Sequence, residues 1–183
     1  MNLGELRTAV ENVVGQGSVS DVVRHFNSCL LAMASTSREI HTQDVAAVNG
    51  EFIIPANVLS IYSMFHQGFP ITWQHIEQNY PPLMGTTPYS AYKEGNKVVL
   101  FPKATCTVTI YYKLKPAALV SDADIPELSD ADHVLINYAV WQIFLDEENP
   151  MADRYRENYL LDESTWRRIN SSANSRPKRI KLV

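Results

Sequence analysis

The sequence has little that marks a membrane, secreted or fibrous protein. None of its apolar runs reaches the roughly 18 residues that a membrane span needs, and its first residues lack the basic-then-apolar order of a signal peptide. Hydrophobic residues make up 45% of the 183 residues and charged residues 20%, which is typical of a soluble globular protein. We therefore expect a protein made and kept in a cytoplasm-like compartment.

Cysteine and histidine are too scattered to predict a metal site. The two cysteines, Cys29 and Cys106, fall on the apolar faces of a predicted helix and a predicted strand, without metal-ligand spacing. None of the five histidines stands in an HxxxH or HxH pair. The sequence predicts buried thiols, no metal ion and no cofactor.

Catalytic motifs are also missing. There is no phosphate-binding glycine pattern and no GxSxG, and carboxylates gather in only two clusters. Paired carboxylates can perform acid–base catalysis or bind a cation, but acids beside a helix N-terminus also interact favourably with its dipole. We favour the second interpretation and predict no catalytic residue. The first cluster is Asp122, Asp124, Glu127, Asp130 and Asp132, and the second is Asp146, Glu147 and Glu148.

Helical periodicity occupies both ends of the sequence. Apolar residues recur at helical spacing over 2–14 and over 19–35, and we expect these two helices to form an antiparallel hairpin. A third helix is predicted with Ser129 or Asp130 as its cap. Pro150 then opens a fourth helix.

Strand patterns occupy the middle of the sequence. The segment 66–92 is rich in aromatic residues and prolines and has no clear period, although a short helix is expected near 72–78. Alternating, β-branched or turn-bounded stretches elsewhere predict strands. These are 39–45 and 51–54 as a hairpin around Asn49-Gly50, then 59–65, then 91–93 and 98–101 as a second hairpin, and 105–112.

This order of elements predicts an α+β protein rather than a parallel α/β fold. We expect a helical bundle of two N-terminal and two C-terminal helices with an inserted, mostly antiparallel β-domain. The predicted boundaries are 1–37 and 126–169 for the helical core, 38–125 for the β-rich insert, and 170–183 for an extended basic tail.

The sequence resembles the head-to-tail adaptor, or connector, proteins of tailed phages, most of all those of short-tailed phages. The marks are the stretches NGEFIIPANVLSIY, VVLFP, TIYYKLKP and DIPELSD, followed by the junction Glu147-Glu148-Asn149-Pro150 between two helices. The resemblance covers residues 18–166.

The resemblance implies a structural, non-enzymatic protein of the virion neck, between capsid and tail. Copies of such a protein pack side by side into a ring, here expected to be a dodecamer that matches the portal above it. The resemblance further implies that the β-insert faces the tail nozzle or another tail protein. We also expect that genome DNA passes through the channel without sequence-specific binding and that no membrane is involved.

The C-terminal tail is the expected portal-binding segment. In similar adaptors this segment orders on docking, and the polar residues 170–175 followed by an alternating basic end suit that role. Alternatives are a solvated end, a nuclear-import signal or a DNA contact. The predicted portal-binding residues are Arg176, Pro177, Lys178, Arg179, Ile180, Lys181, Leu182 and Val183.

The aromatic segment has two interpretations, as ordinary core or as contacts to the tail or to a neighbouring subunit. Its prolines favour the second, because a restricted loop loses less entropy when it docks. The predicted contact residues are Phe69, Trp73, Tyr80, Tyr89 and Tyr92.

Two other functions stay open. The first is a hydrolase that cleaves a polar polymer such as peptidoglycan through the acidic clusters. The second is a DNA-binding protein that uses the basic tail.

Overall fold

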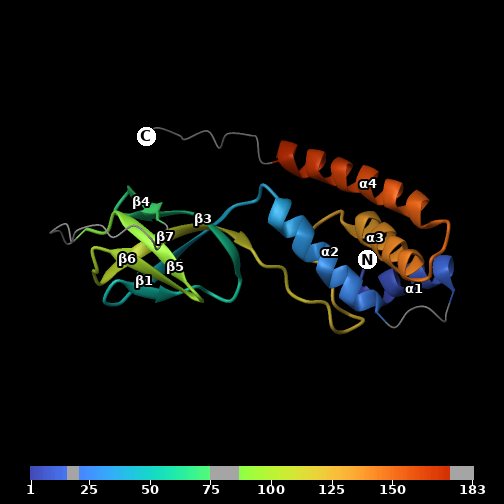
Figure 1. Ribbon diagram of the computed structural model, residues 1–183, viewed down its shortest axis with the longest axis horizontal. Helices are drawn as coiled ribbons and strands as arrows, with labels where there is room; N and C mark the ends of the chain where they lie inside the picture. The colour runs from blue at the N-terminus through green and yellow to red at the C-terminus, as the bar shows by residue number, and fades with distance from the viewer. Residues whose placement is uncertain (16–20, 75–86, 174–183) are drawn as a thin grey trace. The chain divides into compact units, whose positions relative to one another are not determined.

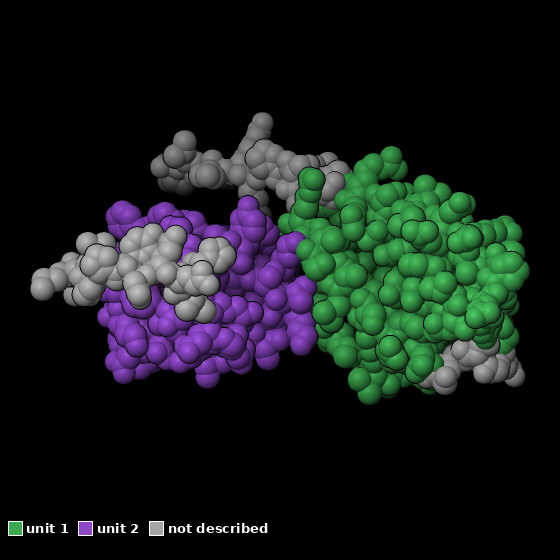
Figure 2. Space-filling model, viewed as in Figure 1, with its two compact units in different colours: residues 1–39, 116–183 green, residues 40–115 purple. Residues whose placement is uncertain are grey.

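The computed structural model of the chain describes residues 1–15, 21–74 and 87–173 (Figure 1). It divides into two compact units: unit 1 comprises residues 1–39 and 116–183, and unit 2 comprises residues 40–115 (Figure 2). The described helices lie in unit 1 and the strands in unit 2, in agreement with the α+β prediction. None of the helices in the described residues combines the length and the apolar character that crossing a membrane requires.

Unit 1 is built around one central helix. α3 packs against each of the other three helices, so apolar side chains surround most of it. Near the end of this helix, Val140 and Ile143 are buried, whereas Leu145 is 53% exposed. The bounds are α1 Leu3–Val14, α2 Val22–Thr36, α3 Asp132–Asp146 and α4 Ala152–Ala173.

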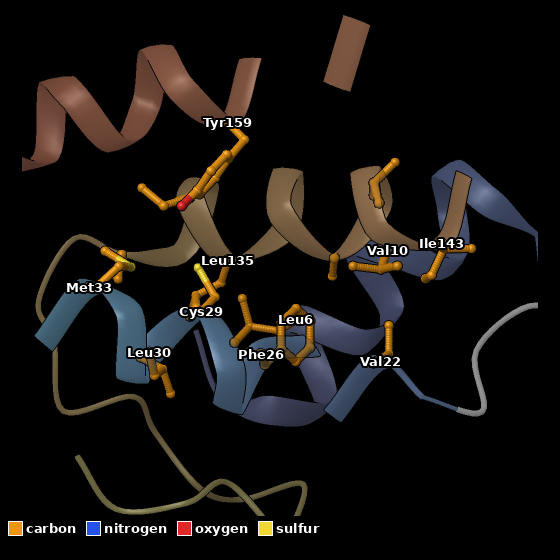
Figure 3. Close-up of a cluster of buried hydrophobic side chains, with 14 of the residues drawn as sticks. Leu6, Val10, Val22, Phe26, Cys29, Leu30, Met33, Leu135, Ile143 and Tyr159 are labelled. Carbon is orange, nitrogen blue, oxygen red and sulfur yellow. The ribbon is translucent and has the colours of Figure 1, made fainter. Parts of the chain in front are cut away.

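The core of unit 1 forms where side chains of all four helices meet (Figure 3). Leu6 and Phe26 are fully buried, and Tyr159 of α4 stacks with Trp141 of α3 at 5.6 Å between ring centroids. Cys29 is also fully buried, and burial raises the pKa of its thiol to about 12. The prediction of buried thiols is therefore confirmed for Cys29, while Cys106 in unit 2 is only partly buried.

Two helix ends differ from the sequence prediction. The N-cap residue of α3 is Ala131, and no side chain caps this helix end, so the prediction of Ser129 or Asp130 as the cap is wrong. The reason is the backbone, because Asp130 adopts a positive φ of 57° in the turn before the helix. At the C-terminal end of α4, residues 170–173 are helical, whereas the sequence predicts an extended tail that begins at residue 170.

Unit 2 is a seven-stranded sheet. The strand order is β1-β7-β3-β4-β5-β6-β2, and every pairing is antiparallel except that of β4 with β5. The buried side chains of the strands form a second core of their own. The bounds are β1 His41–Ala47, β2 Glu51–Ile53, β3 Val58–His66, β4 Phe69–Trp73, β5 Ser90–Glu94, β6 Lys97–Phe101 and β7 Cys106–Leu114.

The predicted Asn49-Gly50 turn is present, but β1 and β2, the strands on either side of it, do not form the predicted hairpin with each other. Asn49 and Gly50 have φ values of 52° and 77°, and Val48 and Glu51 exchange backbone hydrogen bonds across them. Beyond that bridge β1 pairs with β7 and β2 with β6. Because β1 and β2 are the two edge strands, the turn brings the edges together and the sheet must curl around its core.

The sequence prediction misses β4. Gln67 and Gly68 form a second tight turn with φ values of 51° and 82°, after which β4 pairs with β3. Thr72 and Trp73 belong to this strand, so the helix expected near 72–78 is wrong at its start, and its remainder beyond Gln74 lies outside the described residues. Gln-Gly is a weaker turn signal than Asn-Gly, and Pro70 argues against a strand.

Candidate assembly surfaces

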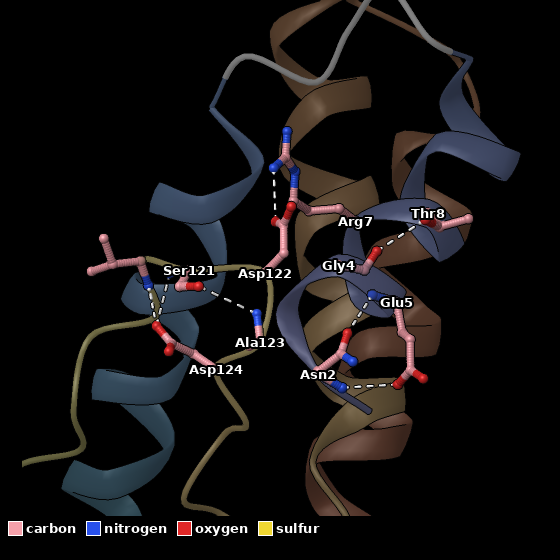
Figure 4. Close-up of polar contacts among 10 residues, drawn as sticks. Asn2, Gly4, Glu5, Arg7, Thr8, Ser121, Asp122, Ala123 and Asp124 are labelled. Atoms are coloured by element: carbon pink, nitrogen blue, oxygen red, sulfur yellow. Dashed lines mark hydrogen bonds and ion pairs between the residues drawn. The ribbon is translucent and has the colours of Figure 1, made fainter.

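Two carboxylates of the first acidic cluster stabilise the loop of residues 120–124 and do not form a catalytic pair (Figure 4). The Asp124 carboxylate accepts hydrogen bonds from the backbone N–H groups of Ser121 and Val120, both at 2.8 Å, and these bonds lower its pKa. The Asp122 carboxylate pairs with Arg7 of α1 at 3.0 Å. Asp124 therefore stabilises the conformation of the loop, and Asp122 attaches the loop to α1.

Two other acids of this cluster, Glu127 and Asp132, have separate partners. The Glu127 carboxylate accepts a hydrogen bond from the N–H of Ala117 at 3.2 Å, and the Asp132 carboxylate pairs with the amino group of Met1 at 3.0 Å. Over residues 1–15, 21–74 and 87–173, no group of three or more His, Cys, Asp or Glu side chains could hold a metal ion. These carboxylates therefore explain loop structure and give no support for acid–base chemistry.

The segment 119–124 also caps the N-terminus of α1 and forms hydrogen bonds with α2. The N–H groups of Leu3 and Gly4 donate to the carbonyls of Asp124 and Asp122 at 2.8 and 3.0 Å, which satisfies two free donors of the α1 N-terminus. Asn27 of α2 accepts from the N–H of Leu119 at 2.8 Å and donates to its carbonyl at 3.0 Å. These contacts explain why residues 116–125, assigned to the β-rich insert by sequence, group with unit 1.

The second acidic cluster lies at the end of α3 and in the turn into α4. Asn149 orders this turn: its N–H donates to the carbonyl of Phe144 at 2.8 Å, and its side-chain oxygen accepts from the N–H of Met151 at 2.9 Å. The sequence places residues 146–148 where they favour the start of α4, but it is the Asn149 side chain that makes a hydrogen bond in the turn before this helix. All three acids are exposed at the C-terminal end of α3, where the helix dipole disfavours negative charge.

The predicted aromatic contact residues occupy different environments in unit 2. Phe69 is 66% exposed beside the β3–β4 turn, and Trp73 is 37% exposed at the other end of β4. Tyr89, also 37% exposed, lies next to β4 because its carbonyl accepts a hydrogen bond from the N–H of Thr72. Tyr92 is partly buried and stacks on Phe101 at 5.6 Å. Tyr80 lies outside the described residues.

A groove that sequence reasoning missed opens in unit 2 beside Trp73. Its volume is about 500 Å³, and its walls are the β2–β3 segment between Ile54 and Ile61 together with Trp73, Lys93 and Lys115. These residues come from four separate stretches of the chain, so only the strand order could have predicted the groove.

The comparison with known protein families matches residues 1–180 to the family described as SU10 adaptor protein. The chain belongs to this family. A search of curated proteins finds no match.

Family membership confirms the resemblance to phage head-to-tail adaptors that the sequence motifs indicate. The adaptor is therefore a structural phage protein and a component of the virion, and its family is not a known enzyme family. Association with other virion proteins follows from this role. The predicted portal-binding segment of the adaptor, residues 176–183, lies outside the described residues.

Proposed function

We propose that this adaptor forms a ring that joins the portal to the tail of a short-tailed phage. The ring consists of twelve copies that match the portal, occupies the virion neck, and leaves a channel through which genome DNA passes during assembly and ejection. The protein is made in the host cytoplasm. The observation that carries this proposal is membership of the adaptor family over residues 1–180.

The charge of the chain supports a conduit rather than a DNA-binding protein. Its formal net charge is −4 at pH 7, whereas a channel lined with many cations would retard DNA through contacts with phosphates. The first acidic cluster, on which a hydrolase would depend, is engaged in holding a loop. Neither alternative function gains support from a described contact.

Two segments of this chain serve the two ends of the ring in this proposal. The basic segment 176–183 binds the portal, where its cations pair with carboxylates and its backbone adds to a sheet edge. The exposed aromatic residues of unit 2 contact the tail or a neighbouring copy, with Phe69 as the first choice because two thirds of it is solvent-exposed.

Deletion of residues 176–183 tests portal binding directly. We expect the deleted protein to keep its circular dichroism spectrum and to lose co-elution with purified portal rings in size-exclusion chromatography with light scattering. A second variant, in which Gln replaces Arg176, Lys178, Arg179 and Lys181, keeps the length and removes the charge, so it should bind portal more weakly than wild type and shows how much of the binding depends on the cations. If the deleted protein still binds portal, the role of the segment is refuted.

The ring itself is tested by imaging. Low-resolution electron microscopy of portal mixed with this protein should show an added ring of defined copy number beneath the portal. A protein that never joins portal, and that instead cleaves a cell-wall substrate or binds DNA in a salt-sensitive way, contradicts the proposal.

A further inference from the structure

The groove of unit 2 is preformed by its own backbone. We call it the lysine groove and define it by the segment 54–61 with Trp73, Lys93, Asn96 and Lys115. The N–H of Ile54 donates to the carbonyl of Asn96 at 2.9 Å, and the N–H of Lys115 donates to the carbonyl of Asn57 at 2.8 Å. These bonds fix the β2–β3 segment at both ends, so a partner meets a wall that is already ordered.

The groove combines apolar surface with two lysines that have no carboxylate partner among the described residues. Trp73 and the β2–β3 segment contribute apolar atoms, and no carboxylate lines the groove within the described residues. Lys93 and Lys115 are exposed and make no ion pair with a described carboxylate, although nearby Lys97 pairs with Glu51 at 3.1 Å. The fitting occupant is therefore a segment that carries both carboxylates and apolar side chains.

The chain itself carries such a segment on unit 1. We call residues 145–151, the turn from α3 to α4, the acidic corner. Leu145 is 53% exposed and Met151 39% exposed, and the carboxylates of Asp146, Glu147 and Glu148 lie between them on the exposed surface. The hydrogen bonds of Asn149 hold this turn in one shape, so its docking costs little conformational entropy.

We propose that the lysine groove of one copy binds the acidic corner of a neighbouring copy. This inference rests on the proposed function, because it assigns two surfaces to the contact between ring subunits. Groove and corner are different surfaces, so the contact is head-to-tail, the type of interface that generates a closed ring when the rotation between neighbouring copies closes. Lysine ammonium groups meet carboxylates while Leu145 and Met151 cover the apolar wall beside Trp73.

Charge reversal with complementation tests the inference. One variant carries Lys93→Glu and Lys115→Glu, and the other carries Asp146→Lys and Glu148→Lys. A control variant with Arg24→Glu and Arg154→Glu, two exposed arginines of unit 1, has the same change in net charge as the groove variant. Each protein is measured alone by sedimentation velocity over a concentration series, and the two charge-reversed variants are also measured as an equimolar mixture.

We expect wild type and control to form concentration-dependent oligomers, and each charge-reversed variant to lose them. The mixture should regain them, because a reversed groove then meets a reversed corner and a native groove meets a native corner around an alternating ring. The wild-type oligomer should also weaken as salt concentration rises.

Three results overturn the inference: oligomers that persist in either charge-reversed variant, a mixture that does not recover them, and a wild type that stays monomeric at every concentration. The first of these is also the result expected if the chain's own residues 75–86 or another virion protein occupy the groove. None of these results refutes the proposed function, which is judged separately by the portal experiments.

Discussion

Gly50 and Gly68 occupy similar turns but have different surroundings. Both have positive φ values, 77° and 82°, where a side chain is strained. A Cβ on Gly50 would lie 2.6 Å from the Cα of Lys103, whereas nothing lies within 4 Å of a Cβ on Gly68. The turn at Gly50 therefore requires glycine because of both its backbone conformation and the close approach of Lys103, whereas the turn at Gly68 requires it for the conformation alone.

We expect Gly68→Ala to lower the free energy of unfolding of unit 2 by about 1–2 kcal/mol, the cost of a left-handed conformation alone. Gly50→Ala should lower the free energy of unfolding clearly more, because the added methyl group would clash with the backbone of Lys103, which cannot rotate away as a side chain can. It also disturbs the bonds that Gly50 makes with Ala104 and Leu100. Urea unfolding of the two variants measures the difference, and equal costs would show that the Lys103 backbone yields easily.

At the scale of elements, one side chain links α2 to the segment that returns from the sheet. Asn27 makes two hydrogen bonds to the backbone of Leu119 and is partly buried. Its loss leaves a donor and an acceptor of Leu119 without their partner, and Leu119 itself is only 3% exposed.

Asn27→Ala should therefore destabilise unit 1 by about 1–3 kcal/mol. Ser28→Ala, on the exposed side of the same helix, should change the stability by less than about 0.5 kcal/mol and serves as the control. Thermal unfolding followed by the helical circular dichroism signal measures both variants. Similar stabilities for the two would mean that water replaces Asn27 at no cost.

The elements show which features are readable from the sequence. The alternation along β7 is confirmed, since Val108, Ile110 and Tyr112 are buried, and so is the hairpin of β5 and β6. Both depend on local patterns. Strand β4 was missed because its Gln-Gly turn is a weak local signal and it contains Pro70. The lysine groove was missed because it depends on which strands become neighbours, which one sequence does not specify.

The candidate site follows the same rule. The motifs identified the adaptor family, but Asp122 and Asp132 pair with Arg7 and with the amino group of Met1, which lie far away in the sequence, and no spacing rule predicts such pairs. Exposure of Phe69 and partial burial of Tyr92 likewise depend on the sheet that surrounds them. The sequence therefore identified the acidic and aromatic residues, but it did not predict which groups each of them contacts.

At the scale of the whole molecule, two cores share one chain that passes between the units twice. The apolar clusters have no residue in common: one is formed by the helices of unit 1 and the other by the strands of unit 2. Each unit thus has its own source of hydrophobic stabilisation.

Two matched substitutions test whether the units unfold separately. Leu135 of α3 and Leu100 of β6 are both 0% exposed, one in each core. Each change to Ala removes the same atoms and should cost about 2–5 kcal/mol. We expect Leu135→Ala to lower the midpoint of the helical transition at 222 nm and to leave protection of the strand amides against hydrogen exchange unchanged. Leu100→Ala should do the reverse, whereas equal losses of both signals from either variant would show that the units unfold as one cooperative structure.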